Sequence, residues 1–247
     1  MTGDLGIKLF ADGADKAGML EMYENPLVSG FTTNPTLMRK AGVTDYLAFA
    51  TDVVEAIPDR PISFEVLSDD FQEMYQEARV LAGLGANVYV KVPVTNTRGA
   101  FAGPLVQRLT AEDVKVNVTA LLSIEQVARV AGCLGDTPAY VSVFAGRIAD
   151  TGRDPVPLMA DALDLLRSRA GVELIWASPR ELLNVVQAAE IGCHVITATN
   201  DILRKLALVG KDLHEYSLET VKMFHDDAQA AGFELDLASY GLVGAPA

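Results

Sequence analysis

Short apolar runs recur eight times along the 247-residue chain, and each is followed by an amphipathic stretch. Their spacing of about 25 residues is what one strand and one helix occupy in a barrel of eight parallel strands. An open doubly wound sheet alternates strands and helices too, but no G-x-G-x-x-G follows the first run. The pattern therefore favours an α/β fold, a single (β/α)8 barrel with TIM-barrel architecture. The runs span residues 7–11, 28–33, 62–67, 88–92, 114–118, 140–144, 173–177 and 194–198.

The segments between the runs read as helices. Residues 69–84 place apolar side chains on one helical face, and Ser123 stands three residues before Gln126, as in a capping box. Residues 154–169 repeat the helical pattern, with Pro155 near the first turn. After the eighth unit, residues 217–231 predict one additional C-terminal helix. We therefore expect one domain over residues 1–235 and a flexible tail over 236–247.

Composition narrows the classes of partner. The formal charge of −13 argues against nucleic-acid binding and against an anionic membrane surface. Cys133 and Cys193 lack the paired spacing of a disulfide framework or a zinc site. No signal peptide and no uncharged membrane-spanning stretch is visible, so we expect a cytoplasmic protein.

Lys91 interrupts an apolar, β-branched run, Asn87-Val-Tyr-Val-Lys-Val-Pro-Val-Thr95. Burial disfavours a charged ammonium, and a neutral amine on a rigid strand is a nucleophile whose usual product with a carbonyl compound is a Schiff base. The alternative is a lysine whose ammonium reaches solvent beyond the strand end.

Polar residues gather where the other expected strands end, which in a barrel is the face that carries the chemistry. Singly, each has a structural explanation: Asp12 and Asn34 can cap helices, Glu65 can pair with an arginine, and buried hydroxyls often bond to backbone. Together they would be costly to bury without a function. The pattern indicates a Schiff-base lysine with acid–base carboxylates and anion-binding arginines. The candidates are Asp12, Thr33, Asn34, Glu65, Lys91, Asn117, Thr119, Ser142, Phe144, Arg147, Ser178 and Arg180.

From about Ile7 to Ala231 the chain resembles the transaldolase family and the related fructose-6-phosphate aldolases. The resemblance is carried by Phe-Ala-Asp12, Gly30-Phe-Thr-Thr-Asn34-Pro35, Val90-Lys91-Val-Pro-Val-Thr95, Asn117-Val-Thr119 and Arg147-Ile148. It implies that a lysine forms a Schiff base with a ketose and retains a dihydroxyacetone unit after carbon–carbon cleavage. A transaldolase passes this unit to an aldehyde, whereas an aldolase releases it.

The resemblance also implies roles. Lys91 would be the nucleophile and Asp12 the acid–base group, while Glu65 and Thr119 would hold a proton-shuttling water. Asn34 and Asn117 would orient the dihydroxyacetone hydroxyls, with Ser142 beside them, and Arg147 would bind the sugar phosphate. No metal and no organic cofactor is implied. A homo-oligomer is expected, and the pentose phosphate pathway is one setting for such an enzyme.

Two positions favour transfer over release. The aldolases typically have glutamine at the position of Glu65 and tyrosine at that of Phe144, and phenylalanine cannot donate a proton to the enamine. The chain departs from the family in Ala177-Ser178-Pro179-Arg180, which is shorter than usual after the seventh strand. Arg180 could bind phosphate from a new angle or lie outside the site. A fructose-6-phosphate aldolase, a transaldolase for an unusual sugar and a catalytically silent barrel that binds a sugar phosphate remain alternatives.

Overall fold

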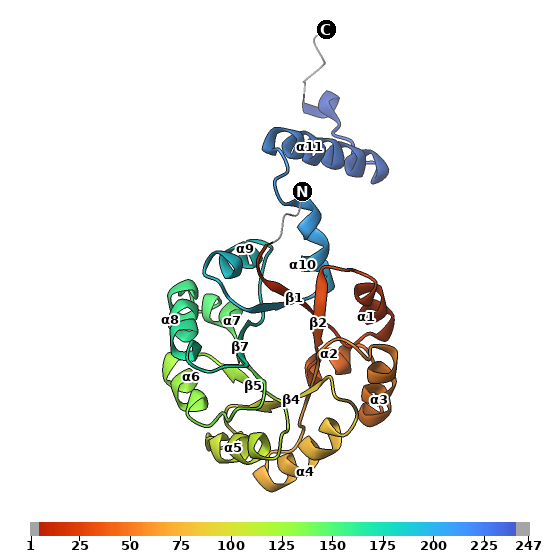
Figure 1. Ribbon diagram of the computed structural model, residues 1–247. Coiled ribbons are helices and arrows are strands. Elements are labelled where there is room, and N and C mark those ends of the chain that lie inside the picture. The colour runs from red at the N-terminus through yellow and green to blue at the C-terminus, as the bar shows by residue number, and fades with distance from the viewer. Residues whose placement is uncertain (1–4, 241–247) are drawn as a thin grey trace. The chain divides into compact units, whose positions relative to one another are not determined.

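Eight parallel strands close into a barrel, and their order around the ring follows their order along the chain (Figure 1). The structure, a computed structural model, describes residues 5–240. All eight predicted runs form strands, which confirms the (β/α)8 fold, although several strand ends differ from the runs. The strands are β1 (Lys8–Asp12), β2 (Val28–Thr32), β3 (Ile62–Glu65), β4 (Val88–Pro93), β5 (Val116–Leu121), β6 (Ala139–Val143), β7 (Val172–Trp176) and β8 (Val195–Ala198).

Helices surround the barrel and connect its strands (Figure 1). They are α1 (Lys16–Tyr23), α2 (Pro35–Lys40), α3 (Tyr46–Ala56), α4 (Phe71–Ala82), α5 (Gly103–Ala111), α6 (Ile124–Ala131), α7 (Ala145–Ala149), α8 (Val156–Leu166), α9 (Leu183–Glu190) and α10 (Asn200–Arg204). The capping box predicted at Ser123 is present, because Ser123 and Gln126 each accept from the other's backbone N–H. Asp70 caps α4 without a reciprocal bond, because its side chain accepts from the N–H groups of Gln72 and Glu73.

The half of the barrel interior nearest the strand N-termini is filled by large apolar side chains. Phe10, Ile175 and Val195 are fully buried, and the Phe10 ring meets Tyr140 edge-on at 5.6 Å between centroids. Gly30 makes room for Phe10, since a Cβ at this position would lie 2.5 Å from the phenyl ring. This layer fills the barrel interior below the carboxyl ends of the strands, so the open part of the interior lies at those ends.

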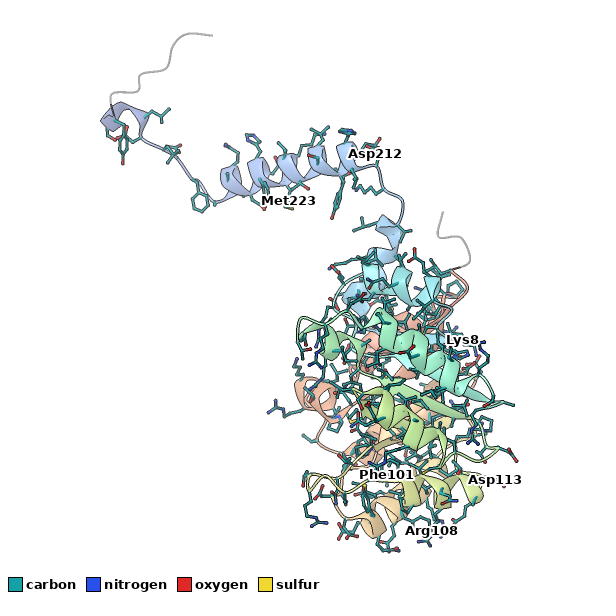
Figure 2. All side chains as sticks on the ribbon, turned by 90° about the vertical axis from the view of Figure 1, so that its left-hand side faces the viewer. Lys8, Phe101, Arg108, Asp113, Asp212 and Met223 are labelled. Carbon is teal, nitrogen blue, oxygen red and sulfur yellow. The ribbon has the colours of Figure 1, made fainter. Side chains whose placement is uncertain are left out.

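The described residues from Ala207 onward form a second compact unit, separate from the unit that ends at Leu206. Its main element is α11 (Leu213–Ala230), which begins earlier than predicted because the Asp212 side chain caps it by accepting from the N–H groups of His214 and Glu215. Within this unit no side chain of α11 is buried (Figure 2). A 3-10 helix covers Leu237–Tyr240, within the expected tail. Residues 241–247 of that tail lie outside the described residues.

Within residues 5–240, no helix has both the length and the apolar character needed to cross a membrane.

Candidate active site

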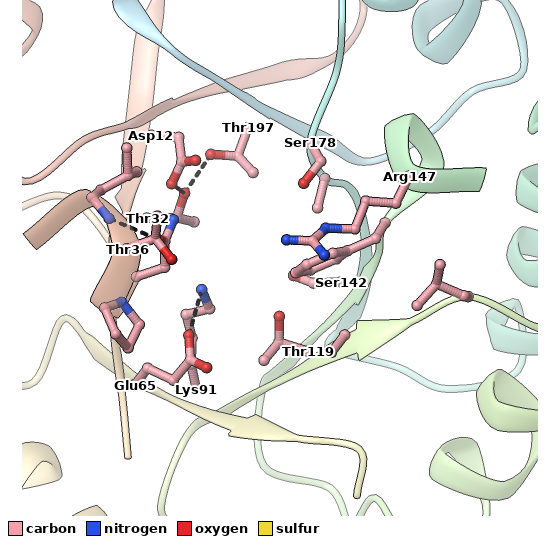
Figure 3. A pocket seen from close by; sticks show the side chains of 17 residues that line it. Asp12, Thr32, Thr36, Glu65, Lys91, Thr119, Ser142, Arg147, Ser178 and Thr197 are labelled. Atoms are coloured by element: carbon pink, nitrogen blue, oxygen red, sulfur yellow. Dashed lines mark hydrogen bonds and ion pairs between the residues drawn. The ribbon is translucent and has the colours of Figure 1, made fainter. Parts of the chain in front are cut away.

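A cavity of about 470 Å³ opens where the barrel strands end (Figure 3). Alternate residues of a strand face the barrel interior, so each strand can present one side chain near its carboxyl end. Seven strands, and the residue directly after β7, do so with Asp12, Thr32, Glu65, Lys91, Thr119, Ser142, Ala177 and Thr197. Ala120 of β5 also lines the cavity. The connecting helices and loops add Asn34, Pro35, Thr36, Leu37, Leu122, Phe144, Arg147 and Ser178.

Lys91 lies on the cavity wall with only 5% of its surface exposed. Its Nζ donates to the Thr33 carbonyl oxygen at 2.8 Å and lies 3.1 Å from Glu65 Oε2. The two side chains meet because Glu65 and Lys91 are register partners on β3 and β4. The alternative of a lysine that reaches bulk solvent is therefore wrong. The cavity instead holds a fixed amine with a carboxylate in position to accept its proton.

Asp12 faces the cavity from the end of β1. Thr32, its register partner on β2, donates through Oγ1 to Asp12 Oδ1 at 2.7 Å. Burial raises the pKa of the Asp12 carboxyl, while the Lys91 charge and the Thr32 hydrogen bond lower it by less. A carboxyl with a raised pKa exchanges protons more readily near neutral pH than an ordinary aspartate does.

Thr119, Ser142 and Asn117 form the next part of the wall and the layer behind it. The Thr119 hydroxyl is buried without a hydrogen-bond partner in the described part of the chain. Ser142 lines the cavity and donates to Asn117 Oδ1 at 2.7 Å. Asn117 is fully buried behind it, is not a lining residue, and donates in turn to Ser63 Oγ at 3.0 Å. The expected set is thus brought together, but Asn117 touches the cavity only through Ser142.

Phe144 and Arg147 occupy the opposite side of the cavity. Figure 3 shows the Arg147 side chain reaching inward from α7, with its guanidinium carbon 5.4 Å from the centre of the Phe144 ring. Among residues 5–240 this guanidinium has no hydrogen bond or ion pair. A Cβ at Gly146 would lie 1.6 Å from the Ser178 carbonyl oxygen, so only glycine lets α7 approach the segment after β7. Arg147 is therefore an exposed cation at the cavity rim, free to meet an anion.

Asn34, Thr33 and Ser178 occupy the rim in different ways. Asn34 lines the cavity and also caps α2, since its Oδ1 accepts from Leu37 N–H at 3.0 Å. The Thr33 side chain is fully buried, lies outside the lining and donates to the Ser63 carbonyl at 2.9 Å. Thr33 contributes to the site through its backbone carbonyl oxygen, which accepts from Lys91 Nζ. Ser178 lines the cavity with a φ of 57°, a left-handed conformation that costs energy in a residue with a Cβ.

Arg180 is not brought into the cavity. Its guanidinium forms a two-pronged pair with Asp150, with Nε donating to Oδ1 at 2.9 Å and Nη2 pairing with Oδ2. This hydrogen bond lowers the pKa of Asp150. The acidic partner directly after α7 thus accounts for the position of Arg180, and its assignment as a substrate-binding residue remains a prediction.

Thr32, Thr36 and Thr197 line the cavity but were not among the candidates from the sequence. Thr197 lies within the apolar run Val195-Ile-Thr-Ala198 and carries no charge to attract notice. The sequence feature that could have identified Thr197 is the two-residue alternation from Val195, which places both residues on the inward face of β8.

Within residues 5–240, no group of three or more His, Cys, Asp or Glu side chains is arranged to hold a metal ion. The charged groups among the lining residues are Asp12, Glu65, Lys91 and Arg147.

A family model described as transaldolase/fructose-6-phosphate aldolase matches residues 9–238. The chain belongs to this family of enzymes. A probable transaldolase from Thermoanaerobacter sp. (strain X514) is 33% identical over 93% of this chain and 100% of its own length. Another from Methanococcus maripaludis (strain C7) is 37% identical over 81% of this chain and 89% of its own.

Solved structures support the fold alone. A deoxyribose phosphate aldolase from Aeropyrum pernix superposes with a TM-score of 0.58 at 12% identity, covering 85% of this chain and 93% of its own. A 2,3-dimethylmalate lyase superposes with a TM-score of 0.54 at 10% identity, over 94% and 86%.

Proposed function

We propose that this enzyme is a transaldolase that moves a dihydroxyacetone unit from a ketose phosphate to an aldose phosphate through a Schiff base on Lys91. The observation that carries the proposal is the buried Lys91 amine, 3.1 Å from Glu65, on the wall of a cavity that Arg147 borders on the other side. Such a cavity suits a substrate with a reactive carbonyl near one end and an anion at the other.

In the first step the Lys91 amine attacks the ketone carbon of the donor to form a carbinolamine, which then loses water to form the imine. Glu65 can take the proton that Lys91 must lose before attack. The unpartnered Thr119 hydroxyl supports a role in holding a water, because a buried hydroxyl without a partner is costly unless something occupies that position. That water would carry protons between the carbinolamine and Glu65.

Asp12 serves the second step. Its carboxylate takes the proton of the donor's C4 hydroxyl, the C3–C4 bond breaks, and the electron pair moves into the imine to give an enamine. The aldehyde fragment leaves and an acceptor aldehyde takes its place. The enamine attacks it, Asp12 returns the proton to the new hydroxyl, and hydrolysis of the imine frees Lys91.

Phe144 supports transfer rather than release, and so does Glu65, where the related aldolases typically have glutamine. Free dihydroxyacetone forms when the enamine is protonated and hydrolysed before an acceptor arrives. Phe144 lines the cavity without any group that could donate a proton. The enamine then persists until an aldehyde binds.

Two further proposals follow from family membership. We expect a homo-oligomer, and α11 supports this expectation because it carries large apolar side chains, such as Val221 and Phe224, that a neighbouring copy can bury. Light scattering coupled to size exclusion would measure the mass. We also expect a cytoplasmic enzyme of carbohydrate metabolism, with the pentose phosphate pathway as the first setting to examine by cell fractionation and metabolite profiling.

The deciding experiment incubates the enzyme with fructose 6-phosphate, with and without erythrose 4-phosphate, and measures free dihydroxyacetone and the transfer product. We expect transfer product with the acceptor and little free dihydroxyacetone without it. Borohydride reduction with donor present should add a three-carbon unit to the peptide that contains Lys91. Copious free dihydroxyacetone would identify an aldolase instead. An adduct on another lysine, or none with any ketose phosphate tried, would refute the Schiff-base assignment.

A further inference from the structure

Two threonine hydroxyls connect β8 to the Asp12 carboxylate along the inner face of the barrel. Thr32 Oγ1 lies 2.7 Å from Asp12 Oδ1 and 2.5 Å from Thr197 Oγ1 (Figure 3). The three residues meet because β1 lies between β2 and β8. Thr32 is 3% exposed and Thr197 5%, so bulk water cannot replace either hydrogen bond freely.

Each hydroxyl has one proton to donate, and this fixes the direction of the two hydrogen bonds. Thr32 donates to the carboxylate, which has no proton to offer when ionised. The proton in the short contact between the threonines must therefore come from Thr197. The order is Thr197 to Thr32 to Asp12 Oδ1. Within the described residues Asp12 Oδ2 has no hydrogen-bond partner, so it is the carboxylate oxygen available to a substrate.

The arrangement differs from that of an ordinary buried threonine. Thr33, the neighbour of Thr32 in the chain, donates to a backbone carbonyl, and so does Thr110 in α5. Such bonds satisfy the hydroxyl and orient nothing else. The hydroxyls of Thr197 and Thr32 instead end on a carboxylate of the cavity.

We propose that Thr197 is a positioning residue that acts through Thr32 on Asp12. It keeps the Thr32 proton directed at Oδ1, so that Oδ2 is the oxygen that exchanges a proton with the substrate hydroxyl. The inference about catalysis rests on the proposed function, whereas the inference about Asp12 itself does not.

Asp12 has other charged neighbours whose effect must be separated from that of the threonines. Lys91 on β4 lowers the pKa of Asp12, and Glu65 on β3 raises it. Arg147 lines the cavity from α7. A hollow that adjoins Asp12 is lined by four more charged residues, Asp15, Lys40, Asp201 and Arg204. Because Thr197→Val alters none of these charges, a change in Asp12 would trace to the hydroxyl chain.

The test compares Thr197→Val, which keeps the shape but cannot donate, with Thr197→Ser, which keeps the hydroxyl. Without Thr197 as donor, Thr32 is less polarised and can turn away from Oδ1, so the pKa of Asp12 should rise further. For Thr197→Val we expect kcat for transfer to fall about 3- to 10-fold with little change in KM. The acidic limb of the kcat/KM profile should move to higher pH. Trapping of the donor on Lys91 should be unimpaired, and Thr197→Ser should restore both kcat and the pH profile.

Thr110→Val is the matched control, since it removes a buried hydroxyl that lies in α5 outside the cavity and bonds only to backbone carbonyls. It should leave kcat and the pH profile unchanged. An unchanged profile for Thr197→Val, a loss confined to KM, or equal impairment in Thr197→Ser would overturn the proposal.

A second measurement separates this inference from the proposed function. The carboxyl carbon of Asp12 can be followed by NMR in substrate-free enzyme, with Asp12→Asn identifying the signal. A higher Asp12 pKa in Thr197→Val would uphold the hydroxyl chain even if the wild-type enzyme transferred no dihydroxyacetone. If the wild-type enzyme does transfer dihydroxyacetone but the Asp12 pKa is unchanged in Thr197→Val, the hydroxyl chain is refuted and the proposed function stands.

Discussion

The two halves of the barrel interior are built on the same strands, but one half is apolar and the other carries charged and polar side chains. On β1, Phe10 and Asp12 are two residues apart, and on β6, Tyr140 and Ser142 are as well. Phe10 and Tyr140 belong to the lower layer, nearer the amino ends of the strands, and pack into an apolar cluster. Asp12 and Ser142 belong to the upper layer, nearer the carboxyl ends, and line the cavity. A shift of two positions along a strand therefore separates residues that stabilise the fold from residues that can react.

The division can be seen in the ionisable groups of each layer. In the lower layer, burial raises the pKa of Tyr89 and Tyr140, whose rings lie 4.3 Å apart, so both stay neutral and act as packing. In the upper layer Lys91 and Glu65 form an ion pair at the cavity edge. Burying such groups costs stability that the lower layer must supply. Substitutions in the upper layer should then change activity without loss of fold, and substitutions in the lower layer should do the reverse.

Lys91→Arg should give the largest effect. A guanidinium stays protonated and cannot attack a carbonyl, so activity should fall on the order of 10⁴-fold or more, with no borohydride adduct. Circular dichroism and thermal unfolding should show an intact barrel. Retained activity, or an adduct elsewhere, would remove Lys91 from the mechanism and erase the distinction between the layers.

Ile175→Ala should produce the converse result. Ile175 is fully buried in the lower layer, and truncation of such a residue costs about 2–5 kcal/mol of unfolding free energy. Urea denaturation should report this loss, while kcat of the folded enzyme should stay close to wild type. Leu165→Ala in α8, where Leu165 is 40% exposed, is the control and should cost little. A large fall in kcat for Ile175→Ala would mean that the two layers are coupled.

Hydrophobic periodicity was enough to predict the barrel, because eight buried strands must each present an apolar run. It was also enough to place Lys91 and Asp12, since charged residues at strand ends contrast with their surroundings. It was less informative about hydroxyl groups. Thr197 has ordinary strand propensity, and only closure of the ring brings β8 next to β1 and Thr197 onto Thr32.

Arg180 shows a second limit. A basic residue after a barrel strand suggested an anion site, but its partner, Asp150, lies 30 positions earlier in the chain. Nothing in the sequence predicts that Gly146 lets α7 approach Ser178 closely enough for the pair to form. Competition between possible partners is a property of packing, which linear spacing does not contain.

Arg147→Ala should weaken the apparent affinity for phosphorylated donors about 10–100-fold, or about 1.5–3 kcal/mol, because paired hydrogen bonds from a guanidinium are lost. The loss should appear in KM or kcat/KM and be small with free dihydroxyacetone as donor. Arg180→Ala should matter less, because Arg180 is already paired with Asp150. A larger effect from Arg180→Ala would make Arg180 the main anchor. No effect from either would indicate a substrate that ends in another group.

Asp12→Asn should show how much stability is lost by burying an ionised carboxylate in the upper layer, because its effect on Tm should depend on pH. Burial raises the pKa of Asp12 in the folded state, so the folded protein binds this proton more tightly than the unfolded chain does. The stability contributed by Asp12 is thus present at acidic pH and lost as pH rises through the folded-state pKa. Asparagine cannot ionise, so Tm should exceed that of wild type near pH 7–8, and the difference should shrink toward pH 4.

Asp150→Asn is the matched control for that measurement and should show the opposite trend. Arg180 lowers the pKa of Asp150, so its contribution to stability is present at neutral pH and lost as pH falls through the folded-state pKa. The variant should be less stable than wild type at pH 7 and converge with it in acid. If both variants followed the same pH trend, the two carboxylates would not differ in the way their surroundings indicate.

Phe144→Tyr should have the smallest effect, and it acts on the outcome of the reaction rather than its rate. Phe144 is in contact with both layers, because it packs against the lower apolar cluster and also lines the cavity. A tyrosine hydroxyl there would add a proton donor beside the enamine, so we expect release of free dihydroxyacetone to rise about two- to tenfold relative to transfer. The ratio is measured with fructose 6-phosphate at several acceptor concentrations. Phe71→Tyr, at the start of α4 and outside the cavity lining, is the control and should leave it unchanged. An unmoved ratio in a folded, active Phe144→Tyr enzyme would mean that exclusion of a proton donor does not protect the intermediate. The preference for transfer would then have to come from elsewhere in the upper layer, with Glu65 the next residue to change.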